Sequence, residues 1–489
     1  MKKLNHFASA IVILLLIFFP SCKNQIKVSD QKYQIVSEIG NNTESPFYLS
    51  FLNYPKERNK LPIGIFDSGT GGLTVLNTIF QMDQYDNASK NIGVDGLLDF
   101  NSEKFIYLAD ESNMPYGRYD SEGKADFLRE LIIKDVRFLL GKDYYNSPSD
   151  YKAQTDKQEV KAIVIACNTA TAYGLETVQK AIQDWGIDVR VIGIVDAGSK
   201  AVLQAMENPS SKVIGVLASE GACSSQAYPN SIVENYVKIF GDENVAVIQQ
   251  AGIGLAGAID GDLNYIDPNA SNPRDAKSYQ GPDIEHLKYP LDLSLWEAYN
   301  FEVKGLLTLY DDEGQLIHAQ LNSVTNYIRY MVTHMMENIK TDYTDKALSR
   351  VILGCTHYPY FEAQIQEHFL YLKSLNEEYD QLINADIQFV DPSEALAMEL
   401  YEFLKSNDLW GDSKNEDSQF YISVPNPLLV KNTINEKGEF PYDYKYGRTL
   451  NSNLQYVKVV PFSDEWIKET IQSRMESNIP YTHKMIYQN

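Results

Sequence analysis

The chain repeats one local pattern, in which a short run rich in β-branched residues ends in small polar residues and leads into a segment with helical spacing of apolar residues. Clear copies are "PIGIFDSGTGGLTVLNTIF" (62–80), "VKAIVIACNTATAYGLETVQKAI" (160–182) and "RVILGCTHYPYFEAQIQEHF" (350–369). Strands that alternate with helices predict an α/β fold, with parallel sheets covered by helices on both faces. In such sheets ligands bind at the carboxyl ends of the strands.

Two of these strand ends carry a cysteine in similar surroundings. Cys167 ends "IVIAC" and Cys355 ends "VILGC", and both are followed by polar residues that suit the start of a helix. A thiol at a helix N-terminus feels the positive end of the backbone dipole, which lowers its pKa. Free main-chain N–H groups at the same place bind carboxylates. Each motif therefore predicts a reactive thiol beside an anion site.

Two facing thiols suit one kind of chemistry. One thiolate takes a proton from a carbon atom and a thiol on the opposite face returns one, which inverts a stereocentre without a cofactor. Two other interpretations stay open from the residues alone: the cysteines are small buried hydrophobes, or they form a disulfide with each other. The chain has 4 cysteines, too few for a disulfide framework in an exported domain of this size.

The composition excludes some functions. The formal net charge is −23, which argues against nucleic acid as a partner because phosphate binding needs a basic surface. The 7 histidines show no paired spacing such as HExxH, so no metal site is predicted. The sequence "GIGLAG" at 252–257 has the glycine spacing of a dinucleotide loop, but an irregular segment follows it and no nucleotide site is predicted.

The N-terminus has the layout of a targeting segment. Lys2 and Lys3 precede the apolar run 11–19, and "PSC" then leads to Cys22. The run is too short for a membrane span and suits a signal peptide. Small residues before a cysteine resemble a bacterial lipoprotein signal, which implies cleavage before Cys22 and lipid attachment there. The predicted location is the cell envelope, on the periplasmic or outer-membrane face; an uncleaved anchor or an ordinary signal peptide is the alternative.

Five motifs occur in an order that resembles a known family: "GIFDSGTGGLTVL", "MPYG", "ACNTATA", "IGVLASEG" and "GCTHYP". They are similar to motifs of the aspartate/glutamate racemases, and of glutamate racemase in particular. The resemblance implies two doubly wound, flavodoxin-like domains related by pseudo-two-fold symmetry, with the active site in the cleft between them. It also implies that no pyridoxal phosphate or metal takes part and that the substrate is a small amino acid.

The resemblance also implies an organisation of the chain. A lipoprotein signal (1–21) and a tether with an irregular lead-in (22–60) come first. One racemase domain combines 61–188 with 386–475, and the other spans 189–385, including an insertion at about 260–345. A homodimer is left open.

The same motifs imply roles for single residues. Cys167 resembles the base that acts on the D-isomer and Cys355 the base that acts on the L-isomer, with His357 assisting the second thiol. Asp67 belongs to a loop that holds the substrate ammonium group and supports the first cysteine. The other residues implied to bind the substrate are Ser68, Pro115, Tyr116, Gly117, Asn168, Thr169 and Thr356.

Two departures from the family pattern bear on activity. Gln250 stands in "QQAG" where the family usually has a glutamate that assists the second cysteine. The predicted lipoprotein signal places the chain outside the cytoplasm. D-glutamate for cell-wall precursors, however, is made inside the cytoplasm. Even with these departures, the resemblance implies a cofactor-independent isomerase that interconverts L- and D-glutamate. A lipid-anchored amino-acid-binding protein with weakened catalysis, or a racemase for aspartate or a related amino acid, is the alternative.

Overall fold

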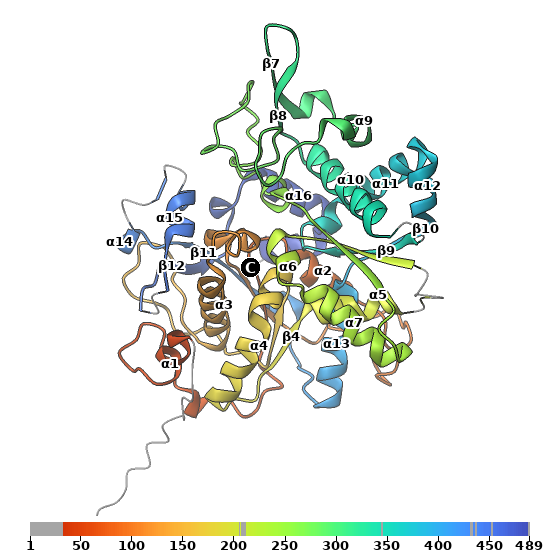
Figure 1. Ribbon diagram of the computed structural model, residues 1–489. Coiled ribbons are helices and arrows are strands. Elements are labelled where there is room, and N and C mark those ends of the chain that lie inside the picture. The colour runs from red at the N-terminus through yellow and green to blue at the C-terminus, as the bar shows by residue number, and fades with distance from the viewer. Residues whose placement is uncertain are drawn as a thin grey trace, which may run out of the picture.

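The computed structural model describes residues 33–204, 206, 212–343, 346–430, 434–435, 438–450 and 453–487. Their strands form two large sheets and a separate hairpin (Figure 1). The predicted signal segment and Cys22 lie outside the described residues. The first sheet runs in the order β12 (Val457–Pro461), β11 (Gln419–Pro425), β2 (Phe105–Ala109), β1 (Ile63–Asp67), β3 (Ala162–Ile165) and β4 (Arg190–Gly193).

The first sheet is buried on both faces, as its continuous apolar strands predict. Along β1 successive side chains enter opposite cores: Ile65 joins one apolar cluster and Phe66 joins the other. Helices α2, α13 and α17 contribute to the first cluster, and α1, α3 and α4 contribute to the second. The sheet is parallel from β11 to β4, and β12 pairs antiparallel at the edge.

The second sheet has four parallel strands in the order β10 (Ile383–Val390), β9 (Ala347–Gly354), β5 (Lys212–Ala218) and β6 (Ala246–Ala251). It also lies between two apolar clusters. On one face it packs against α10 and α11, and on the other against α7 (Figure 1). Parallel sheets with helices on both faces confirm the predicted α/β class.

The strand order of each sheet reverses beside its cysteine. β1 lies at the centre of the first sheet, β2 is added on one side of it, and β3, which leads to Cys167, is added on the other. β5 has the same place in the second sheet, between β6 and the strand β9 that leads to Cys355. The crevice at such a switch point is the usual ligand site of a doubly wound sheet. The two sheets therefore present their cysteines at equivalent places.

The α-helices vary from one turn to five, and the longest pack on the sheets. Their bounds are α1 (Gln34–Gly40), α2 (Leu73–Gln81), α3 (Ala125–Leu140), α4 (Asn168–Trp185), α5 (Ile194–Leu203), α6 (Glu220–Ser224), α7 (Ala227–Phe240), α8 (Leu255–Ile259), α9 (Trp296–Tyr299), α10 (Val324–Asp342), α11 (Glu362–Leu375), α12 (Glu377–Leu382), α13 (Ser393–Ser406), α14 (Pro427–Val430), α15 (Tyr442–Gly447), α16 (Glu469–Asn478) and α17 (Pro480–Tyr487). Among the described residues, no helix is long and apolar enough to cross a membrane.

The chain passes from one sheet to the other a few residues later than the predicted domain limits. β4 pairs with β3, so the first sheet extends past residue 188 to Gly193. β10 pairs with β9, so the second sheet extends past residue 385 to Val390. The reason is that each sheet is completed by one further crossover strand, and sequence alone does not tell which sheet such a strand joins.

The predicted lead-in is more regular than expected within the described residues. Residues 34–40 form α1, and its Ile35, Val36 and Ile39 are buried in the same apolar cluster as α3 and α4. The indole nitrogen of Trp185 donates a hydrogen bond to the carbonyl oxygen of Val36 at 3.0 Å. This part of 22–60 is therefore attached to the first domain rather than a loose tether.

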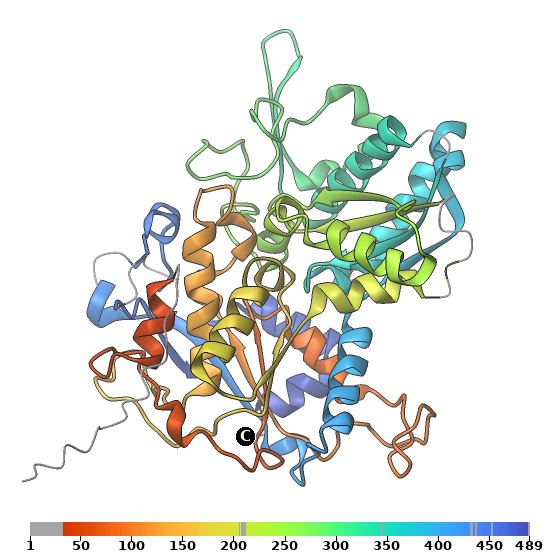
Figure 2. The same ribbon diagram turned by 60° about the horizontal axis from the view of Figure 1, so that its bottom comes forward.

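The predicted insertion at about 260–345 includes both core and projecting parts. Its antiparallel hairpin, β7 (Leu306–Tyr310) and β8 (Leu316–Leu321), extends from the body of the molecule in both views (Figures 1 and 2). After β8, helix α10 begins at Val324 and runs to Asp342. Because α10 packs on the second sheet, the end of the insertion is part of that domain's core.

Candidate active site

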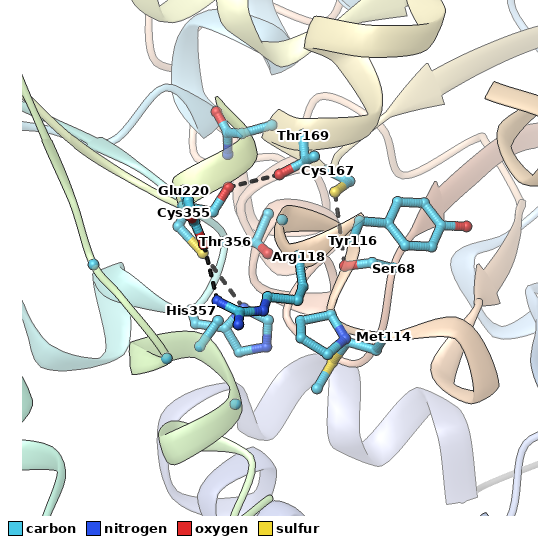
Figure 3. A pocket seen from close by; sticks show the side chains of 18 of the residues that line it. Ser68, Met114, Tyr116, Arg118, Cys167, Thr169, Glu220, Cys355, Thr356 and His357 are labelled. Carbon is cyan, nitrogen blue, oxygen red and sulfur yellow. Dashed lines mark hydrogen bonds and ion pairs between the residues drawn. The ribbon is translucent and has the colours of Figure 1, made fainter. Parts of the chain in front are cut away.

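A cavity lies where the carboxyl ends of the two sheets meet. Figure 3 shows the side chains that line it. Loops that follow β1, β2 and β3 supply one side, and loops that follow β5, β6 and β9 supply the other. Both Cys167 and Cys355 line it. All three cysteines of the described residues are free, so the alternative of a disulfide between Cys167 and Cys355 is wrong for this structure.

Cys167 stands at the junction of β3 and α4, as predicted. It is the N-cap of α4, and its sulfur accepts a hydrogen bond from the backbone N–H of Ala170 at 3.4 Å. The thiol donates to the hydroxyl oxygen of Ser68 at 3.7 Å. Burial and the nearby Asp67 carboxylate raise the pKa of Cys167 well above its usual value, so the predicted lowering is wrong: desolvation outweighs the helix dipole here. A thiol of this kind holds its proton, which suits a proton donor.

Cys355 differs from Cys167 in the backbone that comes after it. No α-helix begins at once, because a 3-10 turn at Tyr358–Phe361 comes first and α11 lies beyond it. The predicted helix N-terminus directly after Cys355 is therefore wrong. In its place the imidazole Nδ1 of His357 lies 3.6 Å from the sulfur of Cys355. This pairing agrees with the predicted assisting role of His357.

The ring of His357 is held by a buried carboxylate. Its Nε2 lies 2.6 Å from Oδ2 of Asp260, and both side chains are almost fully buried. Burial opposes a charged imidazole, but attraction to Asp260 outweighs it and raises the pKa of His357 well above its usual value. Arg474 of α16 binds the other oxygen of Asp260. An imidazolium at this place offers a charged hydrogen-bond donor to the sulfur of Cys355.

Asp67 lies behind the cavity rather than in its lining. Its Oδ2 accepts a hydrogen bond from the backbone N–H of Gly72 at 2.7 Å and from the hydroxyl of Thr356 at 3.3 Å. Its Oδ1 is buried without a partner, and burial raises the pKa of Asp67 above its usual value. The contact with Thr356 joins the ends of β1 and β9. The structure therefore places Asp67 beside both cysteine loops.

The predicted "PYG" loop lines the cavity, but its tyrosine points away from it (Figure 3). The Tyr116 hydroxyl lies 2.5 Å from Asp110 and 2.6 Å from Asp135, which are both buried. A phenol has one proton, so at least one of these carboxyl groups is protonated and donates to Tyr116. Burial raises the pKa of both carboxyls, which also favours a protonated form. Tyr116 therefore fixes the loop from behind.

The neighbouring residues Pro115 and Gly117 face the cavity. A Cβ atom at Gly117 would come within 2.9 Å of the Cβ atom of Ser219, which is closer than two carbon atoms that are not bonded approach each other. Glycine is therefore required where the loop passes the end of β5. Its backbone is open to a ligand.

Three polar residues beside the cysteines complete the predicted binding set. Asn168, Thr169 and Thr356 all line the cavity. The oxygen of Asn168 accepts a hydrogen bond from the Tyr228 hydroxyl at 2.5 Å, whereas its amide nitrogen has no partner. Thr169 shares a 2.7 Å hydrogen bond with Ser219 across the two domains. The free amide donor of Asn168 is suited to a carboxylate next to the reacting carbon.

Replacing Asn168 with aspartate tests this donor. The variant keeps the acceptor for Tyr228 but places a second carboxylate oxygen where the amide was. We expect the KM for a carboxylate substrate to rise about 100-fold, because a charged hydrogen bond becomes a repulsion. Steady-state kinetics measure the change. Tyr228→Phe, which leaves the amide in place, is the control and should have a much smaller effect; an unchanged KM in Asn168→Asp contradicts the role.

Several residues of the site were not predicted. Asp260 lies at the edge of the predicted insertion, and the sequence predicts no role for it. Arg118 directly follows "PYG" and Glu220 lies within "ASEG", but neither is among the predicted site residues. Tyr265 of the insertion also lines the cavity. An acidic residue shortly after the "GIGLAG" loop was the available signal for Asp260, but its pairing with His357 depends on the fold.

Gln250 does not occupy the place that the family pattern suggested. Its side chain hydrogen-bonds to Asn338 and to the backbone of Ala251, and it does not line the cavity. The carboxylate that supports the second thiol is Asp260, which comes later in the chain. Within the described residues, no three His, Cys, Asp or Glu side chains are grouped so as to hold a metal ion.

The chain is similar in sequence to glutamate racemases of several bacteria. That of Lactobacillus johnsonii is 24% identical over 352 residues, which cover 72% of this chain and 84% of that one. That of Aquifex pyrophilus is 26% identical over 369 residues, with coverage of 74% and 93%. The solved glutamate racemase of Francisella tularensis in complex with D-glutamate is 19% identical, with a TM-score of 0.43 over 80% of this chain and 96% of that one. No family model matches the chain.

Proposed function

We propose that this chain is a glutamate racemase, an isomerase that interconverts L- and D-glutamate without a cofactor. The observation that carries the proposal is the pair of cysteines that line one cavity from equivalent switch points of two sheets. The similarity to glutamate racemases, which extends over 72% and 74% of this chain in the two comparisons, supports the substrate. The expected amino-acid substrate fits a cavity with one unpartnered amide donor and one arginine.

The reaction uses the different surroundings of the two thiols. In the L-to-D direction the thiolate of Cys355, stabilised by His357, removes the proton from Cα. Cys167, whose pKa burial raises, gives its own proton to the opposite face. The C–H electron pair stays on carbon until that second proton arrives, so the product is the D-isomer with Cys167 as thiolate and Cys355 as thiol. The reverse direction starts from this state.

The carbanionic character at Cα needs support while neither proton is attached. Electrostatic stabilisation by fixed donors usually contributes most to lowering the barrier of such a step. Asn168 offers a free N–H donor beside Cys167, and the substrate's own ammonium group lies next to the charge. Asp67, behind the thiol, supplies a negative charge that favours that ammonium group. These groups take the place of an electron sink.

Loss of optical activity tests the proposed function. Reduced protein should bring pure L-glutamate and pure D-glutamate to the same racemic end point, with no added cofactor. Polarimetry or circular dichroism follows both reactions. A chain that binds glutamate but leaves both enantiomers unchanged over hours contradicts the racemase and leaves a binding protein.

We also propose that the chain is exported and lipid-anchored through Cys22. The support is the sequence alone: a basic start, a short apolar run and small residues before a cysteine. The expected result is that a labelled fatty acid is incorporated into the full chain and that Cys22→Ala abolishes both labelling and membrane sedimentation. Equal labelling of the variant would contradict the anchor. A homodimer stays a prediction.

A further inference from the structure

The rim of the cavity holds an unusual group of charges. Arg118, at the end of the "PYG" loop, and Glu220, at the start of α6, both line the cavity and face each other across the two domains (Figure 3). Of the described residues that line the cavity, Arg118 alone carries a guanidinium or ammonium group. A dicarboxylic amino acid has two carboxylates to bind, and a cation is the strongest partner for one of them.

The bond between Arg118 and Glu220 is loose. Nη1 of Arg118 lies 3.3 Å from Oε2 of Glu220, and the arginine's other ion pair, with Glu122, is also 3.3 Å long. Its firmest contact is the 2.9 Å hydrogen bond from Nε to the Tyr442 hydroxyl. That bond anchors one side of the guanidinium plane. The other side is aimed at the cavity with only a long contact to hold it.

Glu220 has other partners besides Arg118. Its other oxygen, Oε1, is bound by both Lys288 and Tyr289 of the insertion. Burial opposes its ionised form, but the hydrogen bonds from Lys288 and Tyr289, together with the charges of Arg118 and Lys288, outweigh burial and lower the pKa of Glu220 below its usual value. Arg118 can therefore leave Oε2 while Glu220 keeps its two short contacts.

The two ends of the substrate have separate places. The carboxylate on Cα is one bond from the reacting carbon, so its partners lie beside the thiols, where Asn168 follows Cys167 directly. Arg118 and Glu220 come from different loops at the rim, where the far end of a longer side chain reaches. A carboxylate at that end can replace Oε2 of Glu220 on a guanidinium that is already partly buried.

We propose that Arg118 binds the distal carboxylate of the substrate and selects dicarboxylic amino acids, and that Glu220, held by the insertion, occupies Arg118 in the empty site. The inference rests on the proposed function, since it names the specificity of the same cavity. It gives the insertion a role in this selection. Arg118 acts on recognition and takes no part in the proton transfers.

Equilibrium binding tests this assignment without requiring turnover. The reduced full chain is titrated with racemic glutamate and, separately, with racemic glutamine, which replaces the distal carboxylate with a neutral amide. We expect Arg118→Gln to weaken glutamate binding about 30-fold and glutamine binding by less than about threefold. Arg118→Lys should recover part of the loss. Glu220→Gln should strengthen glutamate binding, because it removes the competing carboxylate.

Arg129→Gln is the matched control, because it removes a guanidinium group from a residue that does not line the cavity and has no part in holding Glu220. Its effect on the glutamate-to-glutamine ratio should stay below about threefold. Equal weakening of both ligands by Arg118→Gln, or no weakening, would overturn the assignment. A wild-type protein that prefers glutamate over glutamine yet never racemises it would overturn the proposed function and leave the role of Arg118 intact.

Discussion

Replacing Cys355 with alanine is expected to stop racemisation and yet leave proton exchange on one enantiomer. Interconversion needs a thiol on each face of Cα, so kcat should fall by about 10³-fold. Cys167 remains, and it should still remove and return the Cα proton of D-glutamate on one face. Cys167→Ala should give the mirror result, with exchange kept for L-glutamate. Proton NMR in heavy water measures exchange, and polarimetry measures inversion.

The pattern across the two variants distinguishes chemistry from damage to the fold. Cys223→Ala is a matched control, because this third free cysteine does not line the cavity. It should leave both rates within about twofold. If Cys355→Ala racemises glutamate at the wild-type rate, or if both cysteine variants exchange the same enantiomer, the assignment of one thiol to each face is wrong.

Replacing Asp260 with asparagine should slow the enzyme and shift its pH dependence. The change keeps the shape of the side chain but removes the charge that raises the pKa of His357. Burial then dominates, the pKa of His357 falls, and the imidazole loses its proton at neutral pH. Without an imidazolium beside it, the sulfur of Cys355 lacks a charged hydrogen-bond donor during the proton transfer. We expect kcat/KM to fall about 10²-fold.

The equilibrium constant between enantiomers is one, so kcat/KM in Asp260→Asn must fall equally in both directions. The signature is the pH profile, whose alkaline limb should move to lower pH as His357 titrates earlier. A purely structural role would reduce activity at every pH alike. Arg474→Gln provides a comparison, since it also disturbs the carboxylate but leaves its charge on His357. An unshifted profile in Asp260→Asn would contradict the role of Asp260.

Local patterns were sufficient to predict the α/β class and the two cysteines of the cavity, and the resemblance to racemases implied eight further residues of its lining. The two cysteine motifs are short and lie at strand ends, and parallel strands bring such ends together at one edge. Of the predicted non-lipid site residues, all but Asp67 line the cavity. The inward position of Cys167 and its role as the N-cap of α4 agree directly with the strand–turn–helix pattern.

The features that sequence could not supply depend on contacts between distant segments. The lowered pKa expected for Cys167 ignored its complete burial beside Asp67. Asp260 is separated from His357 by 97 positions, and only the packing of the insertion brings them together. Tyr116 was expected to face the substrate, but two buried carboxyls on the other side draw its hydroxyl away. Each of these depends on the environment of a side chain rather than on its motif.

The most direct test of the two-thiol account is the fate of deuterium early in the reaction. Wild-type protein is given pure L-glutamate in heavy water, and the enantiomers are separated before a tenth of the substrate has reacted. The account predicts that the D-glutamate formed carries deuterium at Cα, because Cys167 delivers a deuteron that comes from the solvent. The remaining L-glutamate should still carry its original hydrogen at Cα in most molecules. Product that keeps the original hydrogen would contradict it, since a single base would then carry the same proton from one face to the other.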